Sequence, residues 1–284
     1  MKTIARIIKP RRWERNFLVD KLKKRNRGEI LFPEKADFGK ELQDAEIVVS
    51  NWLTKEEVAL AKKLKYVIVP TSGIENIDIK SLNDRDILFY QNKEIFAETV
   101  SEYVVKNLSE LGIIFTDHTI ISLLGFGNVG TKIYNRLSKT LSKIYVVKKH
   151  TERVDLGEYH LDFLGSTKDI PFVLESADIL INALPLTLET RGLCTKLTYT
   201  IKMGSVIVNV SRSGILNDQE ILDLTKRGYF GGAIFDVYPE NINERDYITQ
   251  NIKLTPHIAG ISGESLEKIT EFVYSKLSSL NEVV

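Results

Sequence analysis

The sequence of 284 residues contains one cysteine, Cys194, and no long apolar run. A single cysteine excludes an internal disulfide bond, and with it the disulfide framework of a small secreted domain. Cys194 stands in a stretch rich in leucine and threonine without a histidine or aspartate motif, so we interpret it as a buried structural thiol. No apolar stretch approaches about 18 residues, and no signal-peptide core is visible at the N-terminus. We therefore expect a cytoplasmic protein without a membrane-spanning segment.

A large excess of charge of one sign is also absent. The 39 lysines and arginines nearly balance the 38 aspartates and glutamates, and the formal net charge is +1. Without a basic field, we expect neither a nucleic acid nor a membrane surface as a partner. The four histidines show no spacing with cysteine or aspartate that is typical of a metal site, so no metal is predicted.

Short β-branched runs alternate with amphipathic helical patterns along the whole chain. Ten strands are predicted, over Thr3–Ile8, Glu46–Ser50, Tyr66–Pro70, Ile87–Tyr90, Thr119–Leu124, Ile144–Val147, Asp178–Asn182, Ser205–Asn209, Gly232–Phe235 and Ile252–Leu254. This alternation predicts the α/β class, with parallel sheets built from βαβ crossovers. We expect a Rossmann-type doubly wound sheet and a smaller flavodoxin-like α/β substrate domain.

Two long helical patterns suggest how the chain is divided. Ala97–Phe115 separates the first four predicted strands from the others, and Ser262–Asn281 follows the last strand. A chain of this length is above the size at which one core usually splits into two. We therefore predict a discontinuous substrate domain, residues 1–91 and 260–284, and a dinucleotide-binding domain, residues 92–259, between its halves.

A glycine-rich turn fits the pattern G-x-G-x-x-G and consists of Gly125, Phe126, Gly127, Asn128, Val129 and Gly130. It directly follows a predicted strand and precedes a helical pattern, which is the context that a dinucleotide site requires. The first glycine permits the tight turn, the second lets a pyrophosphate approach the backbone, and the third allows close packing of helix and strand. The N-terminus of the helix adds N–H donors and partial positive charge. The alternative is a glycine-rich turn that binds no ligand.

The residues after the next strand, Ile144–Val147, bear on the choice of cofactor. An NAD site usually has Asp or Glu there, which accepts hydrogen bonds from the ribose hydroxyls. This chain has Lys148 and Lys149, whose positive charges would attract a 2′-phosphate. We therefore predict NADP in preference to NAD. Two alternatives remain: the lysines only solvate the strand end, or Glu152 or Asp155 swings in to bind a ribose.

Three further segments resemble a known family. Residues 184–192, 203–212 and 255–260 read LPLTLETRG, MGSVIVNVSR and TPHIAG. With the glycine-rich turn, they stand in the order and spacing of the D-isomer-specific 2-hydroxyacid dehydrogenases. That family includes glyoxylate/hydroxypyruvate reductases and phosphoglycerate dehydrogenases. The resemblance covers most of the chain after residue 65.

The resemblance implies hydride transfer between a nicotinamide cofactor and a small 2-keto or D-2-hydroxy acid. It makes Arg212 the residue that binds the substrate carboxylate and keto oxygen, a task that suits the fork of guanidinium donors. It makes His257 the general acid and base, since an imidazole can serve both directions near neutral pH. Ser72 and Gly73 resemble the loop whose backbone N–H groups bind the substrate carboxylate.

Further cofactor contacts of the family correspond to Leu184, Pro185, Thr190, Val210, Asp236, His257 and Gly260. The resemblance implies that the Asp236 carboxylate accepts a hydrogen bond from the nicotinamide carboxamide. The alternative is that Asp236 only caps the end of its strand.

Two departures from the family pattern concern the site. The glutamate that orients the family's catalytic histidine comes one position early here, as Glu240, and Asn241 occupies the usual position. We assign the role to Glu240, with Asn241 as the alternative and Glu244 as a remote third. Ser213 stands where the family has a glycine after its arginine, and Gly214 follows it.

The expected activity is that of a glyoxylate or hydroxypyruvate reductase, and the expected assembly is a homodimer, which is common in the family. One alternative is a short NAD-dependent D-3-phosphoglycerate dehydrogenase. Another, from a different class, is a dinucleotide-sensing interaction module without catalytic activity, which is similar to the C-terminal-binding corepressors.

Overall fold

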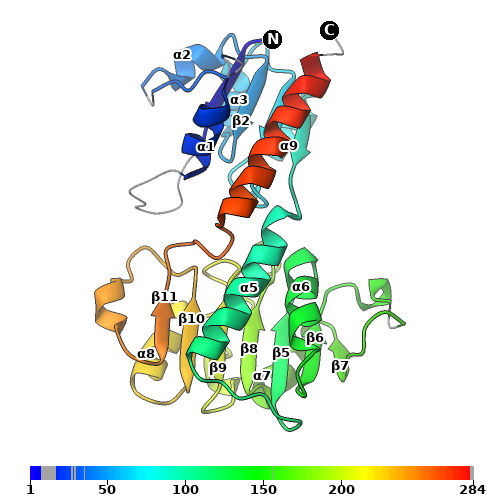
Figure 1. Ribbon diagram of the computed structural model, residues 1–284, viewed down its shortest axis with the longest axis vertical. Coiled ribbons are helices and arrows are strands. Elements are labelled where there is room, and N and C mark those ends of the chain that lie inside the picture. Colours follow the sequence, from blue (N-terminus) through cyan, green and yellow to red (C-terminus); the bar gives the residue numbers. More distant parts are fainter. Residues whose placement is uncertain (8–16, 27, 29, 35, 156, 282–284) are drawn as a thin grey trace. The chain divides into compact units, whose positions relative to one another are not determined.

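The computed structural model describes residues 1–7, 17–26, 28, 30–34, 36–155 and 157–281 (Figure 1). The chain divides into two compact units, one of Met1–Phe96 and Ile261–Val284 and the other of Ala97–Gly260. The sequence predicted that the first segment ends at residue 91, and in the structure it ends at residue 96. The predicted end of the middle unit was residue 259, and in the structure it is residue 260. Each unit has its own sheet and its own buried core.

The first unit contains a four-stranded parallel sheet in the order β1-β2-β3-β4. Its strands are β1 (Thr3–Arg6), β2 (Ile47–Ser50), β3 (Tyr66–Val69) and β4 (Leu88–Gln91). Leu31 adds a parallel bridge to Ile4 of β1. Counted along the chain with that bridge, the order is 2-1-3-4-5, which is flavodoxin-like. Ile8, at the end of the first predicted strand, lies outside the described residues.

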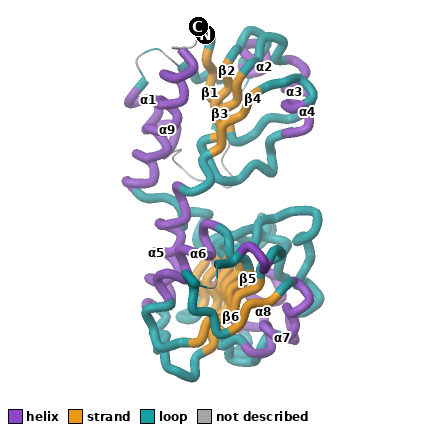
Figure 2. Tube along the Cα trace, turned by 90° about the vertical axis from the view of Figure 1, so that its right-hand side faces the viewer, coloured by secondary structure: helices purple, strands orange, loops and turns teal. Residues whose placement is uncertain are grey.

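Helices cover both faces of this sheet, as Figure 2 shows. They are α1 (Phe17–Arg25), α2 (Phe38–Leu42), α3 (Lys55–Leu60), α4 (Ile79–Asn83) and α9 (Gly263–Asn281). Because side chains alternate along a strand, Ile47 and Val49 of β2 pack in one cluster with residues of α1 and α9. Val48 packs in the other cluster, with residues of α2, α3 and α4. The C-terminal helix thus completes a core that begins with the first strand.

The second unit contains a seven-stranded parallel sheet. Its strands are β5 (Ile120–Leu124), β6 (Lys143–Val147), β7 (Phe163–Gly165), β8 (Ile179–Asn182), β9 (Val206–Asn209), β10 (Gly232–Phe235) and β11 (Ile252–Leu254). The order β7-β6-β5-β8-β9-β10-β11 is the Rossmann order 3-2-1-4-5-6 with a further strand at its end. The predicted fold class is confirmed.

Helices pack on both faces of this sheet (Figure 1, Figure 2). They are α5 (Ile95–Glu110) and α6 (Asn128–Leu137) on one face, and α7 (Ile170–Ser176) and α8 (Asp218–Lys226) on the other. Short 3-10 turns cover Thr151–Arg153, Thr167–Asp169, Thr198–Thr200 and Glu244–Tyr247. Cys194, 2% exposed, lies in the core on the α7 and α8 side, so its predicted burial is confirmed.

Apart from shifts of one or two residues at element ends, two elements differ from the prediction. The helix expected over Ala97–Phe115 ends at Glu110, because Gly112 adopts a φ of +72° in the left-handed region and breaks the helix. Strand β7 was missed because its three residues, at the end of the sheet, are too few to show an alternating pattern. Within the described ranges, no helix is both long enough and apolar enough to cross a membrane.

Candidate active site

The carboxyl ends of six neighbouring strands of the second unit lie in one row. In register, the row consists of Val147, Leu124, Asn182, Asn209, Phe235 and Leu254. Most of the predicted site residues directly follow this row. Strands in a sheet lie ~4.8 Å apart, so the three steps from β5 to β10 span roughly 14 Å. The strand order reverses between β5 and β8, and open α/β sheets bind ligands at the carboxyl edge at such a point.

The glycine-rich turn joins β5 to α6 and is shaped by two close approaches. Gly125 has a φ of +99°, and a Cβ there would lie 2.8 Å from the backbone of Ala183. A Cβ on Gly130 would lie 2.1 Å from the Gly125 carbonyl oxygen. Gly127, the N-cap of α6, is different, since a Cβ there would have no heavy atom within 4 Å. The outer two glycines therefore serve packing, and the middle one leaves the backbone accessible, as a pyrophosphate requires.

The other residues of the glycine-rich turn hold its backbone in place. Phe126 is buried, and its ring packs edge-to-face against Tyr134 and Tyr159, with centroids 5.7 and 5.1 Å away. Asn128 and Val129 form the first turn of α6. The Lys148 Nζ lies 5.9 Å from the centre of the Phe126 ring, which is a cation–π distance. The strand end with Lys148 is thereby joined to the glycine-rich turn.

Lys149 lies beside Glu189, an acidic residue of the segment 184–192 for which the sequence predicted no role. Its Nζ is 2.9 and 2.7 Å from the two carboxylate oxygens of Glu189, in the segment after β8. The hydrogen bond from Lys149 holds the pKa of Glu189 below its ordinary value, which keeps the carboxylate charged. Glu189 therefore neutralises the charge of Lys149 but does not neutralise the charge of Lys148.

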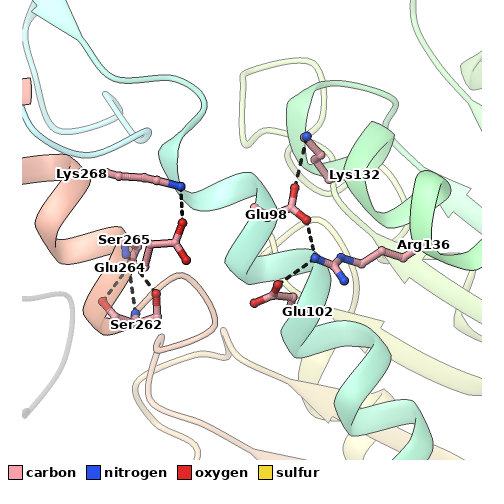
Figure 3. A network of polar contacts seen from close by, with 8 residues as sticks. All are labelled: Glu98, Glu102, Lys132, Arg136, Ser262, Glu264, Ser265 and Lys268. Atoms are coloured by element: carbon pink, nitrogen blue, oxygen red, sulfur yellow. Dashed lines mark hydrogen bonds and ion pairs between the residues drawn. The ribbon is translucent and has the colours of Figure 1, made fainter.

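A network of polar contacts anchors α6 to α5, and Figure 3 shows it from close by. Arg136 of α6 contacts Glu98 and lies 2.8 Å from the Glu102 carboxylate, and the Lys132 Nζ lies 3.2 Å from Glu98. The hydrogen bond from Lys132 lowers the pKa of Glu98. The network links α5 to the helix whose N-terminus forms part of the glycine-rich turn. The other residues drawn belong to the first unit, where Ser262 and Ser265 exchange hydrogen bonds at the start of α9.

Arg212 lies in the turn after β9, and its half-buried guanidinium donates from Nη1 to the Ser211 carbonyl oxygen at 2.8 Å. Asn209, at the end of β9, donates from its amide nitrogen to the Arg212 carbonyl oxygen at 3.4 Å. The same nitrogen donates to Asp218 at 3.0 Å. Both Asn209 and Asp218 are buried.

His257 follows β11 and has an unusual backbone conformation. Its φ of +59° lies in the left-handed region, which is uncommon for a residue with a side chain and is concentrated at functional sites. Its N–H donates to the carbonyl oxygens of Asp236 and Thr255, both at 2.9 Å. The side chain is half-buried.

Asp236 holds the loop that contains His257. Its buried carboxylate accepts from the Thr255 hydroxyl at 2.6 Å, from the Ile258 N–H at 2.8 Å and from the Ala259 N–H at 2.9 Å. These contacts support the alternative that Asp236 caps its strand end, and its contact with a carboxamide stays a prediction. The Thr255 hydroxyl also lies 2.6 Å from the Tyr103 hydroxyl of α5, which the sequence analysis did not consider.

The partner of His257 stays a prediction. Glu240 is exposed and makes no hydrogen bond or ion pair within the part of the chain that the structure describes. Asn241 is exposed as well. Glu244, the third candidate, accepts a hydrogen bond from the Tyr238 hydroxyl.

The remaining predicted contacts lie in loops after strand ends. Pro185 accepts from the Thr190 hydroxyl at 2.5 Å, and Leu184 donates from its N–H to Asn182 at 3.3 Å. Val210 continues the ladder by donating to the Asn182 carbonyl oxygen at 3.3 Å, and Gly260 ends the unit. In the first unit, the Ser72 carbonyl oxygen accepts from Gln91 at 2.6 Å, and the Gly73 carbonyl oxygen from Thr71 at 3.4 Å. The part of Ser72 and Gly73 in substrate binding stays a prediction.

Asn182, Asn209 and Asp218 were not predicted as a group. A signal was present, because β8 and β9 each end in asparagine after three apolar residues, an unusual choice at a buried strand end. Among the described residues, no group of three His, Cys, Asp or Glu side chains could hold a metal ion.

Comparisons with known proteins agree with this architecture. Residues 99–259 match the family model described as D-isomer specific 2-hydroxyacid dehydrogenase, NAD binding domain. The chain is 26% identical to erythronate-4-phosphate dehydrogenase of Psychromonas ingrahamii over 250 residues, covering 84% of this chain and 63% of that protein. It is 23% identical to glyoxylate reductase of Thermococcus litoralis over 264 residues, covering 81% of this chain and 78% of that protein.

Among solved structures, the fold is similar to D-lactate dehydrogenase from Aquifex aeolicus, complexed with NAD and lactic acid. The TM-score is 0.78 at 17% identity, over 99% of this chain and 96% of that one. The family match covers more than half of the chain and includes the glycine-rich turn, Arg212 and His257. The resemblance stated from the sequence is therefore confirmed, and the chain belongs to the D-isomer specific 2-hydroxyacid dehydrogenases, a family of NAD-dependent oxidoreductases.

Proposed function

We propose that the protein reduces a small 2-keto acid, glyoxylate or hydroxypyruvate, to the D-2-hydroxy acid, with NADPH as its preferred cofactor. One observation carries the proposal. The glycine-rich turn, Arg212 and His257 follow strands of one parallel sheet, at the edge where such sheets bind ligands. The similarity to glyoxylate reductase supports the choice of substrate.

The residues divide the chemistry between them. A bound reduced nicotinamide supplies a hydride to C2 of the keto acid. The Arg212 guanidinium binds the carboxylate and the keto oxygen, and it stabilises the negative charge that grows on that oxygen. His257, in its protonated form, donates a proton to the same oxygen and becomes neutral. The product is the hydroxy acid, and the reverse direction uses neutral His257 as the base.

The preference for NADPH rests on Lys148. No carboxylate directly follows β6, where an NAD site usually has one. Lys149 is already paired with Glu189, so Lys148 is the residue that we assign to a 2′-phosphate. Its ammonium group would gain a charge-assisted hydrogen bond.

A second candidate is the oxidation of a phosphorylated D-2-hydroxy acid. The observation that favours it is the similarity to erythronate-4-phosphate dehydrogenases. This chain is 26% identical to the enzyme of Psychromonas ingrahamii and 30% identical to that of Legionella pneumophila. The expected cofactor is then NAD. D-3-phosphoglycerate belongs to the same class of substrate.

Steady-state kinetics separate the two candidates. The proposal predicts the highest kcat/KM for glyoxylate or hydroxypyruvate with NADPH, and little oxidation of erythronate 4-phosphate or 3-phosphoglycerate with NAD. Arg212→Ala should lose at least ~100-fold in kcat/KM, because carboxylate positioning and carbonyl polarisation are lost together. Arg227→Ala is the matched control, since Arg227 is an exposed arginine just after α8. Near-normal kcat/KM in Arg212→Ala would refute the assignment, and activity only on the phosphorylated acids would favour the second candidate.

A further inference from the structure

Two buried side chains hold all four residues of the turn that contains Arg212. The Asn209 amide accepts from the Ser211 N–H at 3.3 Å and donates to the Arg212 carbonyl oxygen at 3.4 Å. The Asp218 carboxylate accepts from the Ser213 hydroxyl at 2.6 Å and from the Gly214 N–H at 3.2 Å. Asn209 and Asp218 are joined to each other at 3.0 Å.

The charge of Asp218 determines the direction of these hydrogen bonds. A carboxylate only accepts, so the Asn209 amide must turn its nitrogen toward Asp218 and its oxygen away. That oxygen accepts from the Asn182 amide nitrogen at 3.0 Å. The Asn182 oxygen is then left to accept from the Leu184 N–H at 3.3 Å. One carboxylate thus orients two amides and reaches the loops after both β8 and β9.

A role in helix stability alone does not account for this arrangement. The N-cap of α8 is Asn217, whose side chain accepts from the Glu220 N–H at 3.4 Å, so the helix has its cap without Asp218. Asn209 is 0% exposed and Asp218 3%, and burying an amide and a carboxylate is costly unless each is fully hydrogen-bonded. Apolar side chains would fill the same space at lower cost, but they would leave the turn free to move.

We propose that Asp218 is a positioning residue for Arg212, and that Ser213 contributes the hydroxyl through which it acts. The inference rests on the proposed function, in which Arg212 binds the substrate carboxylate. It also explains the departure at Ser213, because glycine at this position would remove the hydrogen bond that the Asp218 carboxylate accepts at 2.6 Å. Asp218 contacts the turn rather than the substrate, so it acts by holding the guanidinium in place.

Asp218→Asn tests the proposal with almost no change in volume. Whichever way the new amide turns, its nitrogen faces a donor, either Asn209 or the Ser213 and Gly214 pair. We expect kcat/KM for glyoxylate or hydroxypyruvate to fall at least ~10-fold, since small misplacement of a positioning group is costly in rate. The Kd of NADPH, from its fluorescence, should change less than ~3-fold.

Asn217→Ala is the matched control. It removes the N-cap of the same helix and destabilises it, but it does not touch the turn. Its kcat/KM should stay within ~2-fold of the wild type. Asp218→Asn should have a much smaller effect in an Arg212→Lys background than in the wild type, because Asp218 acts through Arg212.

Ser213→Ala keeps the test decisive if Asp218→Asn does not fold, because it removes only a half-buried hydroxyl. It should raise the KM of the keto acid about threefold with little change in NADPH binding. The positioning role is overturned if Ser213→Ala, and Asp218→Asn where it folds, behave like Asn217→Ala while Arg212→Ala is inactive. Full activity of Arg212→Ala would instead overturn the proposed function and, with it, this inference.

Discussion

Alanine at two glycines of the turn 125–130 should separate stability from cofactor binding. At Gly130 a Cβ would lie 2.1 Å from the Gly125 carbonyl oxygen and 3.0 Å from the carbonyl carbon, so the backbone must move. At Gly127 a Cβ would meet no heavy atom within 4 Å, and the φ of −97° is one that alanine adopts freely. The same substitution therefore meets backbone atoms at Gly130 and open space at Gly127, three residues away.

The magnitudes follow from these contacts. Overpacking against backbone costs up to about 3 kcal/mol, and alanine recovers about 1 kcal/mol of helix propensity, so Gly130→Ala should lose about 2 kcal/mol. For a unit of this size, the melting temperature should fall by roughly 4–8 °C. Gly127→Ala should lose only ~0.5 kcal/mol, since alanine is a poorer N-cap than glycine but meets no steric clash here. Its methyl group occupies the space through which a pyrophosphate approaches, so the Kd of NADPH should rise at least ~10-fold, equivalent to ~1.4 kcal/mol.

Thermal unfolding followed by circular dichroism and titration of NADPH fluorescence measure the two effects. Gly130→Ala should melt early, and Gly127→Ala should melt close to the wild type and bind weakly. The reasoning is refuted if Gly127→Ala binds NADPH as tightly as the wild type while Gly130→Ala is as stable as the wild type.

Three further outcomes are expected. Lys148→Asp should lower the ratio of kcat/KM with NADPH to kcat/KM with NADH at least ~10-fold, because a carboxylate repels a 2′-phosphate. Lys149→Met should lower this ratio less, and equal effects of the two variants would contradict the assignment of Lys148. Burial raises the pKa of Cys194 to about 12, from 9.0 when exposed, so the folded protein should not react with a thiol reagent at pH 8. Because the pKa of the thiol is raised in the folded state, the stability that the protonated thiol contributes is fully present below pH 9 and is lost as the pH rises toward 12. Reaction of Cys194 with the reagent before the protein unfolds would contradict its burial. Tyr103→Phe removes the hydroxyl beside Thr255 and should cost ~1 kcal/mol in chemical denaturation and lower kcat, and an unchanged kcat would show that α5 does not support that loop.

The sequence predicted the elements whose signal is local. Each predicted strand has a counterpart in the structure, and the glycine-rich turn lies between β5 and α6 as its spacing required. Short apolar runs and glycine spacing depend only on neighbouring residues, which is why they can be read without coordinates. Strand β7 was not predicted, because three residues at the end of a sheet are too few to show an alternating pattern.

Contacts between loops could not be predicted in this way. The pair of Lys149 and Glu189 joins residues 40 positions apart, which meet because the order of the strands brings the loops after β6 and β8 together. The contacts of Asp218 depend on the direction in which a side chain points from the first residue of α8. The φ of +59° at His257 could not be predicted either, because histidine, although enriched in the left-handed region, adopts that conformation at only a small share of its positions.

In the proposed function, hydride transfer takes place at one edge of the seven-stranded sheet. A crystal structure of the protein with NADPH and oxamate, a keto-acid analogue that is not reduced, tests this most directly. We predict the pyrophosphate at residues 125–130, the oxamate carboxylate on the Arg212 guanidinium, and the His257 imidazole within hydrogen-bonding distance of the oxamate amide oxygen, which stands for the keto oxygen of the substrate. An oxamate bound away from Arg212, or a cofactor bound elsewhere on the protein, would contradict it.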